Sequence, residues 1–190
     1  MTKTVIFING PPRSGKDTAA KFITKAMSNC SEYKLSQPLK HGLREMFQLT
    51  PKAMKTFEEY KEEPGAILGD LSWRQAQIWL SEEVMKPMFG QNIFGKIGAR
   101  HIHRDMIAPR IVISDCGFID EVRAIRDYRE HPSCYALILY REGCNYDNDS
   151  RDYVDFASLG IPVFAINNDH DLEMYEVQVK RALKTWNLIP

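Results

Sequence analysis

The pattern Gly10-x-x-x-x-Gly15-Lys16, within NGPPRSGKDTAAKFI, is typical of a loop that binds phosphate groups. The two glycines let backbone N–H groups approach an anion, and a helix that begins after them adds its positive end. Lys16 supplies a charge that can reach the β- and γ-phosphate oxygens of a nucleotide. An apolar run precedes the loop and an amphipathic stretch follows it, which favours this interpretation over a glycine-rich turn with a surface lysine. The residues predicted to hold the nucleotide are Gly10, Arg13, Ser14, Gly15, Lys16, Asp17 and Thr18.

Asp17 follows the lysine at a place where a serine or threonine usually binds magnesium. Thr18 carries the hydroxyl one place later, as nucleoside monophosphate kinases of the adenylate-kinase type often do. A carboxylate at the start of a helix is favoured by the helix dipole. We therefore expect Asp17 to hold Mg²⁺ through water or to orient Lys16 or Arg13, and the acid favours a small-molecule kinase.

Asp115 stands at the end of the apolar run RIVIS. An acid at the carboxyl end of a strand beside a phosphate loop is well placed to bind Mg²⁺ through water. The alternative is that Asp115 caps the helix that follows. The upstream loop favours the first interpretation, so the predicted magnesium residues are Asp17, Thr18 and Asp115.

Strands and helices alternate around these residues. The runs 4–8, 110–114, 135–140 and 161–166, with a weaker one at 32–36, are almost continuously apolar, as in parallel strands covered on both faces. Helical patterns lie at 19–27, 120–128 and 171–186. The alternation predicts a three-layer α/β fold of the P-loop NTPase type with a parallel sheet of about five strands.

Two segments depart from this alternation. Residues 38–108 lack a convincing strand and are helical in composition, which predicts a helical insertion. Residues 142–152 are polar and rich in turn formers, which predicts a mobile loop, and 141–153 is the candidate for a short lid. Without repeats or interdomain linkers, 1–190 is predicted to be a single domain.

Composition excludes several classes of protein. The chain has 25 basic and 25 acidic side chains, so we expect no nucleic-acid partner, and no run approaches the roughly 20 apolar residues of a membrane span. The four cysteines have neither zinc nor redox spacing and are expected as free thiols. His101 and His103 do not share a helix face, so no metal site is expected there. These features predict a cytoplasmic protein without a membrane partner and leave a homodimer open.

Three segments together resemble the deoxynucleoside monophosphate kinases of bacteriophages. In that family a Gly-Lys-Asp-Thr loop precedes an (Ala/Ser)-x-Pro-Leu-Lys segment, an Arg-Gln motif and an Asp-x-Arg-Phe-x-x-Glu strand end. Here these are Gly15 to Thr18, Ser36 to Lys40, Arg74-Gln75 with Gln77, and Asp115 to Phe118 with Glu121. The resemblance covers about 1–155 and implies ATP and Mg²⁺ as cofactors, nucleotide substrates, deoxynucleotide biosynthesis and, for a phage protein, the host cytoplasm.

The chain departs from the family at one position. Where the family tends to have an arginine before Phe118, this sequence has Gly117. If that arginine contacts a nucleotide, another must replace it, and Arg123 and Arg110 are nearby in sequence.

A monophosphate kinase also needs an acceptor site, and the insertion 38–108 is predicted to provide it. An arginine fork at Arg74 can grip a phosphate bidentately, while a glutamine or tryptophan can read or stack on a base. Arg74 can equally lie on a solvated helix face, and Trp73 and Trp79 are more often core residues. The candidate acceptor residues are Ser36, Lys40, Trp73, Arg74, Gln75 and Gln77.

Two arginines are candidates to close the site. Arg141 follows an apolar strand and Arg151 lies in the polar loop, and either can offset charge on the moving phosphoryl group. The alternative for each is an acidic surface loop with a local Arg–Asp pair. With Arg13, Lys16 and Asp115 they form the predicted catalytic set.

The predicted reaction is phosphorylation of a deoxynucleoside 5′-monophosphate to its diphosphate by ATP and Mg²⁺. Two alternatives keep the phosphate loop. One is a kinase for another phosphorylated acceptor, similar to phosphomevalonate or dephospho-coenzyme A kinases. The other is a nucleotide-binding switch without catalysis.

Overall fold

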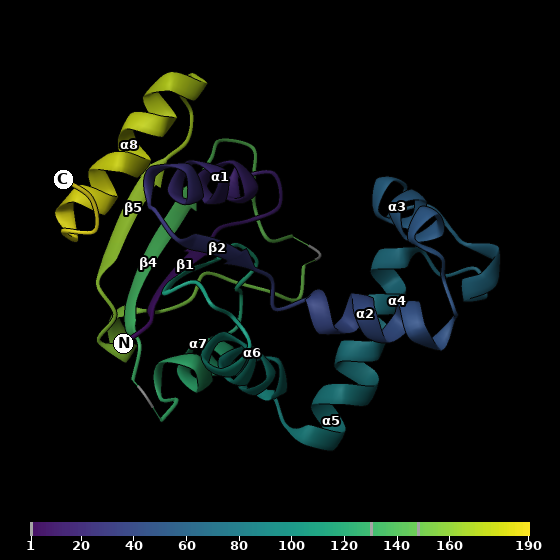
Figure 1. Cartoon of the computed structure of the whole chain (residues 1–190). Coiled ribbons are helices and arrows are strands. Elements are labelled where there is room, and N and C mark those ends of the chain that lie inside the picture. Colours follow the sequence, from purple (N-terminus) through teal and green to yellow (C-terminus); the bar gives the residue numbers. More distant parts are fainter. Residues whose placement is uncertain (1, 130, 148) are drawn as a thin grey trace. The chain divides into compact units, whose positions relative to one another are not determined.

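The computed structural model describes residues 2–129, 131–147 and 149–190 and divides into two compact units. The first comprises 1–35 with 95–190, and the second comprises 36–94. The first unit contains a five-stranded, wholly parallel sheet in the order β2-β3-β1-β4-β5 (Figure 1). The strands are β1 (Thr4–Asn9), β2 (Cys30–Tyr33), β3 (Arg110–Ile113), β4 (Ser133–Tyr140) and β5 (Val163–Asn167). The predicted α/β fold with about five parallel strands is confirmed.

Helices cover both faces of this sheet, which explains its apolar strands. Val5 and Phe7 of β1 pack in one core, and Ile6 and Ile8 pack in the other, as the two-residue period of a strand requires. Figure 1 shows α1 and α8 together on one face. The helices of this unit are α1 (Lys16–Ala26), α6 (Ile93–Arg104), α7 (Ile119–Arg126), α8 (Leu172–Thr185) and the short η3 (Ala157–Leu159).

The second unit is helical. It contains α2 (Gln37–Met46), α3 (Pro51–Glu59), η1 (Ala66–Leu68), α4 (Trp73–Trp79), the π-helix η2 (Leu80–Met85) and α5 (Lys86–Phe89). The predicted insertion 38–108 extends beyond this unit, because Ala99 and Ile102 of α6 belong to a core of the sheet. The helical unit therefore ends at Phe94, where the contacts within it end. Amino-acid composition alone does not reveal this boundary.

The order of the strands determines where a ligand site can form. From β1 the chain first builds the β3 and β2 side of the sheet and then the β4 and β5 side. The carboxyl end of β1 is consequently a topological switch point, where ligands bind in open parallel sheets. The predicted phosphate loop follows this end directly, and Asp115 and the 141–153 segment follow β3 and β4.

The structure bears on two expectations drawn from composition, the state of the cysteines and the presence of a membrane span. All four cysteines are free thiols. Within the described residues, no helix is both long enough and apolar enough to cross a membrane.

Candidate functional site

Side chains hold the carbonyl groups of the loop between β1 and α1. Lys16 Nζ donates to the carbonyls of Gly10 and Pro11, both at 2.6 Å. Three further carbonyls of the loop accept from distant side chains, namely Arg13 O from Arg141 at 3.1 Å, Ser14 O from Asn168 at 2.8 Å and Gly15 O from Tyr175 at 3.1 Å. Because these carbonyls are engaged, the loop and the first turn of α1 can turn N–H groups toward an anion.

The two loop glycines are required for different reasons. A Cβ at Gly10 would lie 2.7 Å from Ser14 Oγ and 2.8 Å from the carbonyl oxygen of Leu139, so only glycine fits. Gly15 has φ of 101°, a left-handed conformation that favours glycine, and a Cβ there would lie 2.5 Å from Asn168 Nδ2. Ser14 Oγ is buried and has no hydrogen-bond partner in the described part of the chain. A tight cradle with a spare polar atom is what a bound phosphate requires.

Lys16 has an unusually acidic ammonium group. Burial first and the nearby charge of Arg151 second lower its pKa from 10.5 to about 8, although Asp17 and Asp149 act in the opposite direction. Lowering by burial and by a second cation indicates that positive charge is concentrated at this loop. A polyanion would relieve that repulsion.

Asp17 is tied to a residue that sequence reasoning missed. Its Oδ1 accepts from Lys34 Nζ at 2.7 Å, just beyond the end of β2. Burial lowers the pKa of Lys34, but the hydrogen bond and charge of Asp17, with Glu32 and Asp115, outweigh it and raise the pKa overall. Asp17 is largely exposed and pairs with Lys34. Lys34 thus links the start of α1 to the ends of β2 and β3.

Asp115 does not cap the helix that follows it. The N-cap of α7 is Phe118, and Asp115 Oδ1 instead accepts from the backbone N–H of Leu35 at 2.8 Å. The capping alternative is therefore wrong. The bond fixes the carboxylate at the carboxyl ends of β2 and β3, on the side of the sheet where the phosphate loop begins.

Asn9, the last residue of β1, ties the end of the 141–153 segment to the phosphate loop. Its buried Nδ2 donates to the carbonyls of Cys116 at 3.0 Å and Asp152 at 3.1 Å and to the hydroxyl of Tyr146 at 3.1 Å. Its Oδ1 accepts from the N–H of Val154 at 3.1 Å. The predicted lid segment therefore meets the sheet one residue before Gly10.

The two candidate lid arginines both lie near the loop. Arg141 is exposed and donates to Arg13 O. Arg151 binds both oxygens of Asp149, at 2.8 Å through Nε and 2.6 Å through Nη2, and the exposed fractions of the two side chains are 22% and 7%. The local Arg–Asp pair considered from the sequence exists for Arg151, but it is shielded rather than on the surface.

The two arginines considered as replacements for the family's arginine have other partners. Arg110 donates to Ser28 O, and Arg123 pairs with Asp120 within α7. The stem of Arg151 instead passes Gly117, where a Cβ would lie 2.5 Å from Arg151 Cβ and Cγ.

In the helical unit, Trp73 is a core residue. Its side chain is fully buried, stacks on Phe57 with ring centroids 5.4 Å apart and donates from Nε1 to Glu58 at 2.7 Å. Glu58 also accepts from Lys40 at 2.6 Å. A ring buried in this way has no face for a base, so its assignment to the acceptor site is corrected. Trp79, expected in the core, is 48% exposed.

The glutamines of the predicted acceptor motif have structural partners. Gln75 Oε1 accepts from Ser72 N–H, and Gln75 N–H donates to Ser72 Oγ, which together form a capping box. Gln77 donates to the carbonyl of Trp73. The spacing Ser-x-x-Gln is itself a sequence signal for the start of a helix.

The other acceptor candidates lie in the same unit. Arg74 pairs with Glu62 at 2.8 Å. Ser36 precedes α2 without a side-chain cap. For Arg74, Lys40 and Ser36 an acceptor role stays a prediction.

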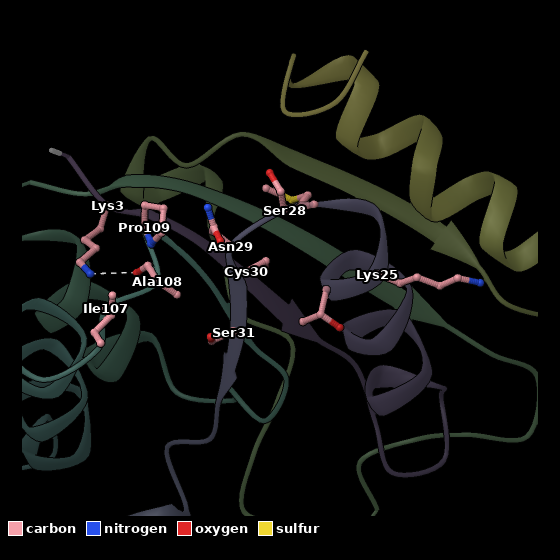
Figure 2. A pocket seen from close by; sticks show the side chains of 11 residues that line it. Lys3, Lys25, Ser28, Asn29, Cys30, Ser31, Ile107, Ala108 and Pro109 are labelled. Carbon is pink, nitrogen blue, oxygen red and sulfur yellow. Dashed lines mark hydrogen bonds between the residues drawn. The ribbon is translucent and has the colours of Figure 1, made fainter.

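Two further observations concern ligand sites outside the phosphate loop. Within the described residues, no three acidic, histidine or cysteine side chains gather as a metal site would require. An open hollow of about 850 Å³ is lined by Lys3, residues at the turn from α1 to β2, and Ile107 to Pro109 (Figure 2). It lies at the amino ends of β1, β2 and β3, the opposite edge of the sheet from Gly10. The hollow is therefore separate from the phosphate loop.

Comparison with protein families identifies the segment that carries this loop. The model of the deoxynucleotide monophosphate kinase family matches residues 4–94. Over these residues the chain is similar to the deoxynucleotide monophosphate kinases. The match confirms the resemblance seen in the sequence and supports a nucleotide kinase role, and hence a phosphotransferase. It includes β1, the phosphate loop, Lys34 and the helical unit.

The solved structures that match this chain are distant from it in sequence. A thymidylate kinase from Candida albicans is 14% identical over 98% of this chain and 93% of its own, with a TM-score of 0.49. The APS kinase CysC Cys556Ala mutant from Mycobacterium tuberculosis is 12% identical over 96% and 98%, with a TM-score of 0.46. TT1252 from Thermus thermophilus is 15% identical over 98% and 97%, with a TM-score of 0.49. No curated protein matches the chain.

Proposed function

We propose that this kinase transfers the γ-phosphoryl group of ATP to the phosphate of a deoxynucleoside 5′-monophosphate. A phosphate oxygen of the acceptor forms the new P–O bond while the bond between the γ-phosphorus and the β,γ-bridging oxygen breaks, giving a diphosphate and ADP. The observation that carries the proposal is the phosphate cradle at Gly10 to Lys16, inside the segment matched by the deoxynucleotide monophosphate kinase family.

The chain's part in such a transfer is to position phosphates and offset their charge. Lys16 releases the carbonyls of Gly10 and Pro11 when phosphate oxygens replace them, because a charged acceptor is the stronger partner for an ammonium group. Arg141 and Arg151 add cations from the segment that follows β4.

The residues present fit a magnesium ion that is bound mainly by substrate phosphates. Mg²⁺ usually takes one or two carboxylates, water and phosphate oxygens. Asp115 offers a carboxylate fixed at the strand ends, and Thr18 offers a hydroxyl in the first turn of α1. Asp17, already paired with Lys34, acts through that lysine in our proposal. When bound, the ion neutralises charge on the β- and γ-phosphates.

The acceptor is proposed to bind the helical unit through Arg74, with Lys40 and Ser36. Arg74 can leave its partner Glu62 for a ligand, because the Glu62 side chain is 63% exposed and exposed ion pairs contribute little to stability. A doubly charged phosphate can therefore compete for the guanidinium fork.

The direct test is to incubate the protein with Mg²⁺, ATP and each ribo- or deoxyribonucleoside monophosphate, and to separate the products by chromatography. We expect ADP and a diphosphate of at least one deoxynucleotide in equal amounts. Lys16→Ala should abolish both products. ATP consumption without phosphorylation of any acceptor, or transfer only to a non-nucleotide phosphate, would overturn the proposal.

A further inference from the structure

Gly117 is a glycine whose backbone does not require one. It is absent from the residues with positive φ, so its conformation is open to any side chain. A Cβ there would nonetheless lie 2.5 Å from Cβ and Cγ of Arg151 and 2.7 Å from its Cδ. Real Cβ atoms do not approach other atoms this closely, so glycine is needed at this position for space alone.

The contact joins two segments that border the phosphate loop. Gly117 follows β3 and the carboxylate of Asp115, and its carbonyl accepts from Asp152 N–H at 3.3 Å. The carbonyl of Asp152 accepts from Asn9, which directly precedes Gly10. The backbone on both sides of the contact is thus fixed to the start of the phosphate loop, so the path of the Arg151 stem is set by Gly117.

The guanidinium of Arg151 keeps donors for a ligand. Of its five N–H groups, Asp149 takes one from Nε and one from Nη2. The remaining three have no partner in the part of the chain that the structure describes. The charge of Arg151 is also felt at Lys16, whose pKa it lowers, and at Asp115, which raises the pKa of Arg151.

We propose that Gly117 is a positioning residue: by lacking a side chain it lets Arg151 lie beside the phosphate loop, where Arg151 is a second cation for the phosphates of ATP. This inference rests on the proposed function for its ligand. It assigns to Gly117 a role that acts through Arg151 and not through contact with the nucleotide.

The test is a double-variant cycle read out as the dissociation constant of Mg-ATP in a calorimeter. Gly117→Ala should weaken binding about tenfold or more, the range expected when a charged hydrogen bond is lost. Arg151→Gly, which also removes the Cβ at the contact, should weaken it by a similar factor. In the Arg151→Gly background, Gly117→Ala should cause no further loss, because there is no stem left to displace.

Thermal unfolding of the same proteins separates positioning from damage. Gly42→Ala is the matched control, since a Cβ there meets only Leu80 Cδ2, at 3.9 Å, and it should bind Mg-ATP like the wild type. If Gly117→Ala leaves the affinity unchanged, or weakens it equally with and without Arg151, the inference is wrong. Transfer assays are run in parallel: a wild type that binds Mg-ATP but phosphorylates no nucleotide refutes the proposed function, while the binding cycle still decides the role of Gly117.

Discussion

Replacement of Asn9 by alanine tests how the phosphate loop and the lid segment are held together. Asn9 is fully buried, and its two N–H groups are shared among the Cys116 and Asp152 carbonyls and the Tyr146 hydroxyl. Its Oδ1 accepts one more bond, from Val154. Two donors and one acceptor amount to about three neutral hydrogen bonds, each contributing about 1 kcal/mol. We therefore expect Asn9→Ala to lower the free energy of unfolding by about 3 kcal/mol.

The assay is urea denaturation followed by circular dichroism, with hydrogen exchange as a local readout. In thermal unfolding, the same loss of 3 kcal/mol lowers the midpoint temperature of a chain this long by about 10 °C. The Val154 amide should exchange faster than in the wild type because its acceptor has gone. Asn145→Ala is the control, since this exposed asparagine accepts one local bond, from Asp147 N–H.

A loss below about 1 kcal/mol, or unchanged exchange at Val154, would refute the reasoning. Either result would mean that water or a shifted backbone satisfies the four partners equally well, and that Asn9 does not fix the 141–153 segment. A similar loss of stability in Asn145→Ala would also contradict the reasoning, because it would show that the effect does not depend on burial of the asparagine.

Three further predictions concern the two units. The affinity for Mg-ATP should fall as pH rises through about 8, because phosphates bind the ammonium form of Lys16 and its pKa is lowered from 10.5 to about 8; calorimetry from pH 7 to 9.5 checks this, and a flat profile contradicts it. Trp73→Phe keeps an aromatic ring but removes the bond to Glu58, so urea unfolding should show a loss of about 2 kcal/mol with the KM for the monophosphate unchanged. A raised KM with full stability would instead place Trp73 against the substrate. Gln75→Ala should reduce stability by about 1 kcal/mol or less through loss of the capping box, and a large fall in monophosphate binding without that loss would restore its acceptor role.

The sheet and the loop were predictable because their signals are local. Apolar runs such as 4–8 and 110–114 and the glycine spacing at Gly10 and Gly15 each lie within a few residues, so strand, turn and helix can be recognised without knowledge of the fold. The weak run at 32–36 was the least certain strand, and β2 lies at Cys30–Tyr33, about two residues earlier. Its place at the edge of the sheet explains the short, polar pattern.

The residues that build the site from a distance were not predictable. Asn168 and Tyr175 bind the loop carbonyls from more than 150 residues away, and Lys34 meets Asp17 only because β2 ends beside α1. No periodicity or spacing marks such contacts. Trp73 was misassigned for a related reason, since a motif shows which residues recur together and not which of them face the core.

The sequence left two interpretations of Arg151 open, a cation for the phosphoryl group or a local Arg–Asp pair on the surface. The burial of the Arg151–Asp149 pair, and not the pairing itself, separates them. An exposed pair would contribute little and need no further explanation. This pair is shielded, and taking both charges out of water has a cost that mutual attraction often fails to offset. Position 117 also has no side chain, which leaves space for the Arg151 stem. The guanidinium then disfavours the charged form of Lys16 and lowers its pKa. The arrival of a polyanion would relieve the repulsion between these two cations. Arg151 is therefore better explained as part of a phosphate site than as a device for stability.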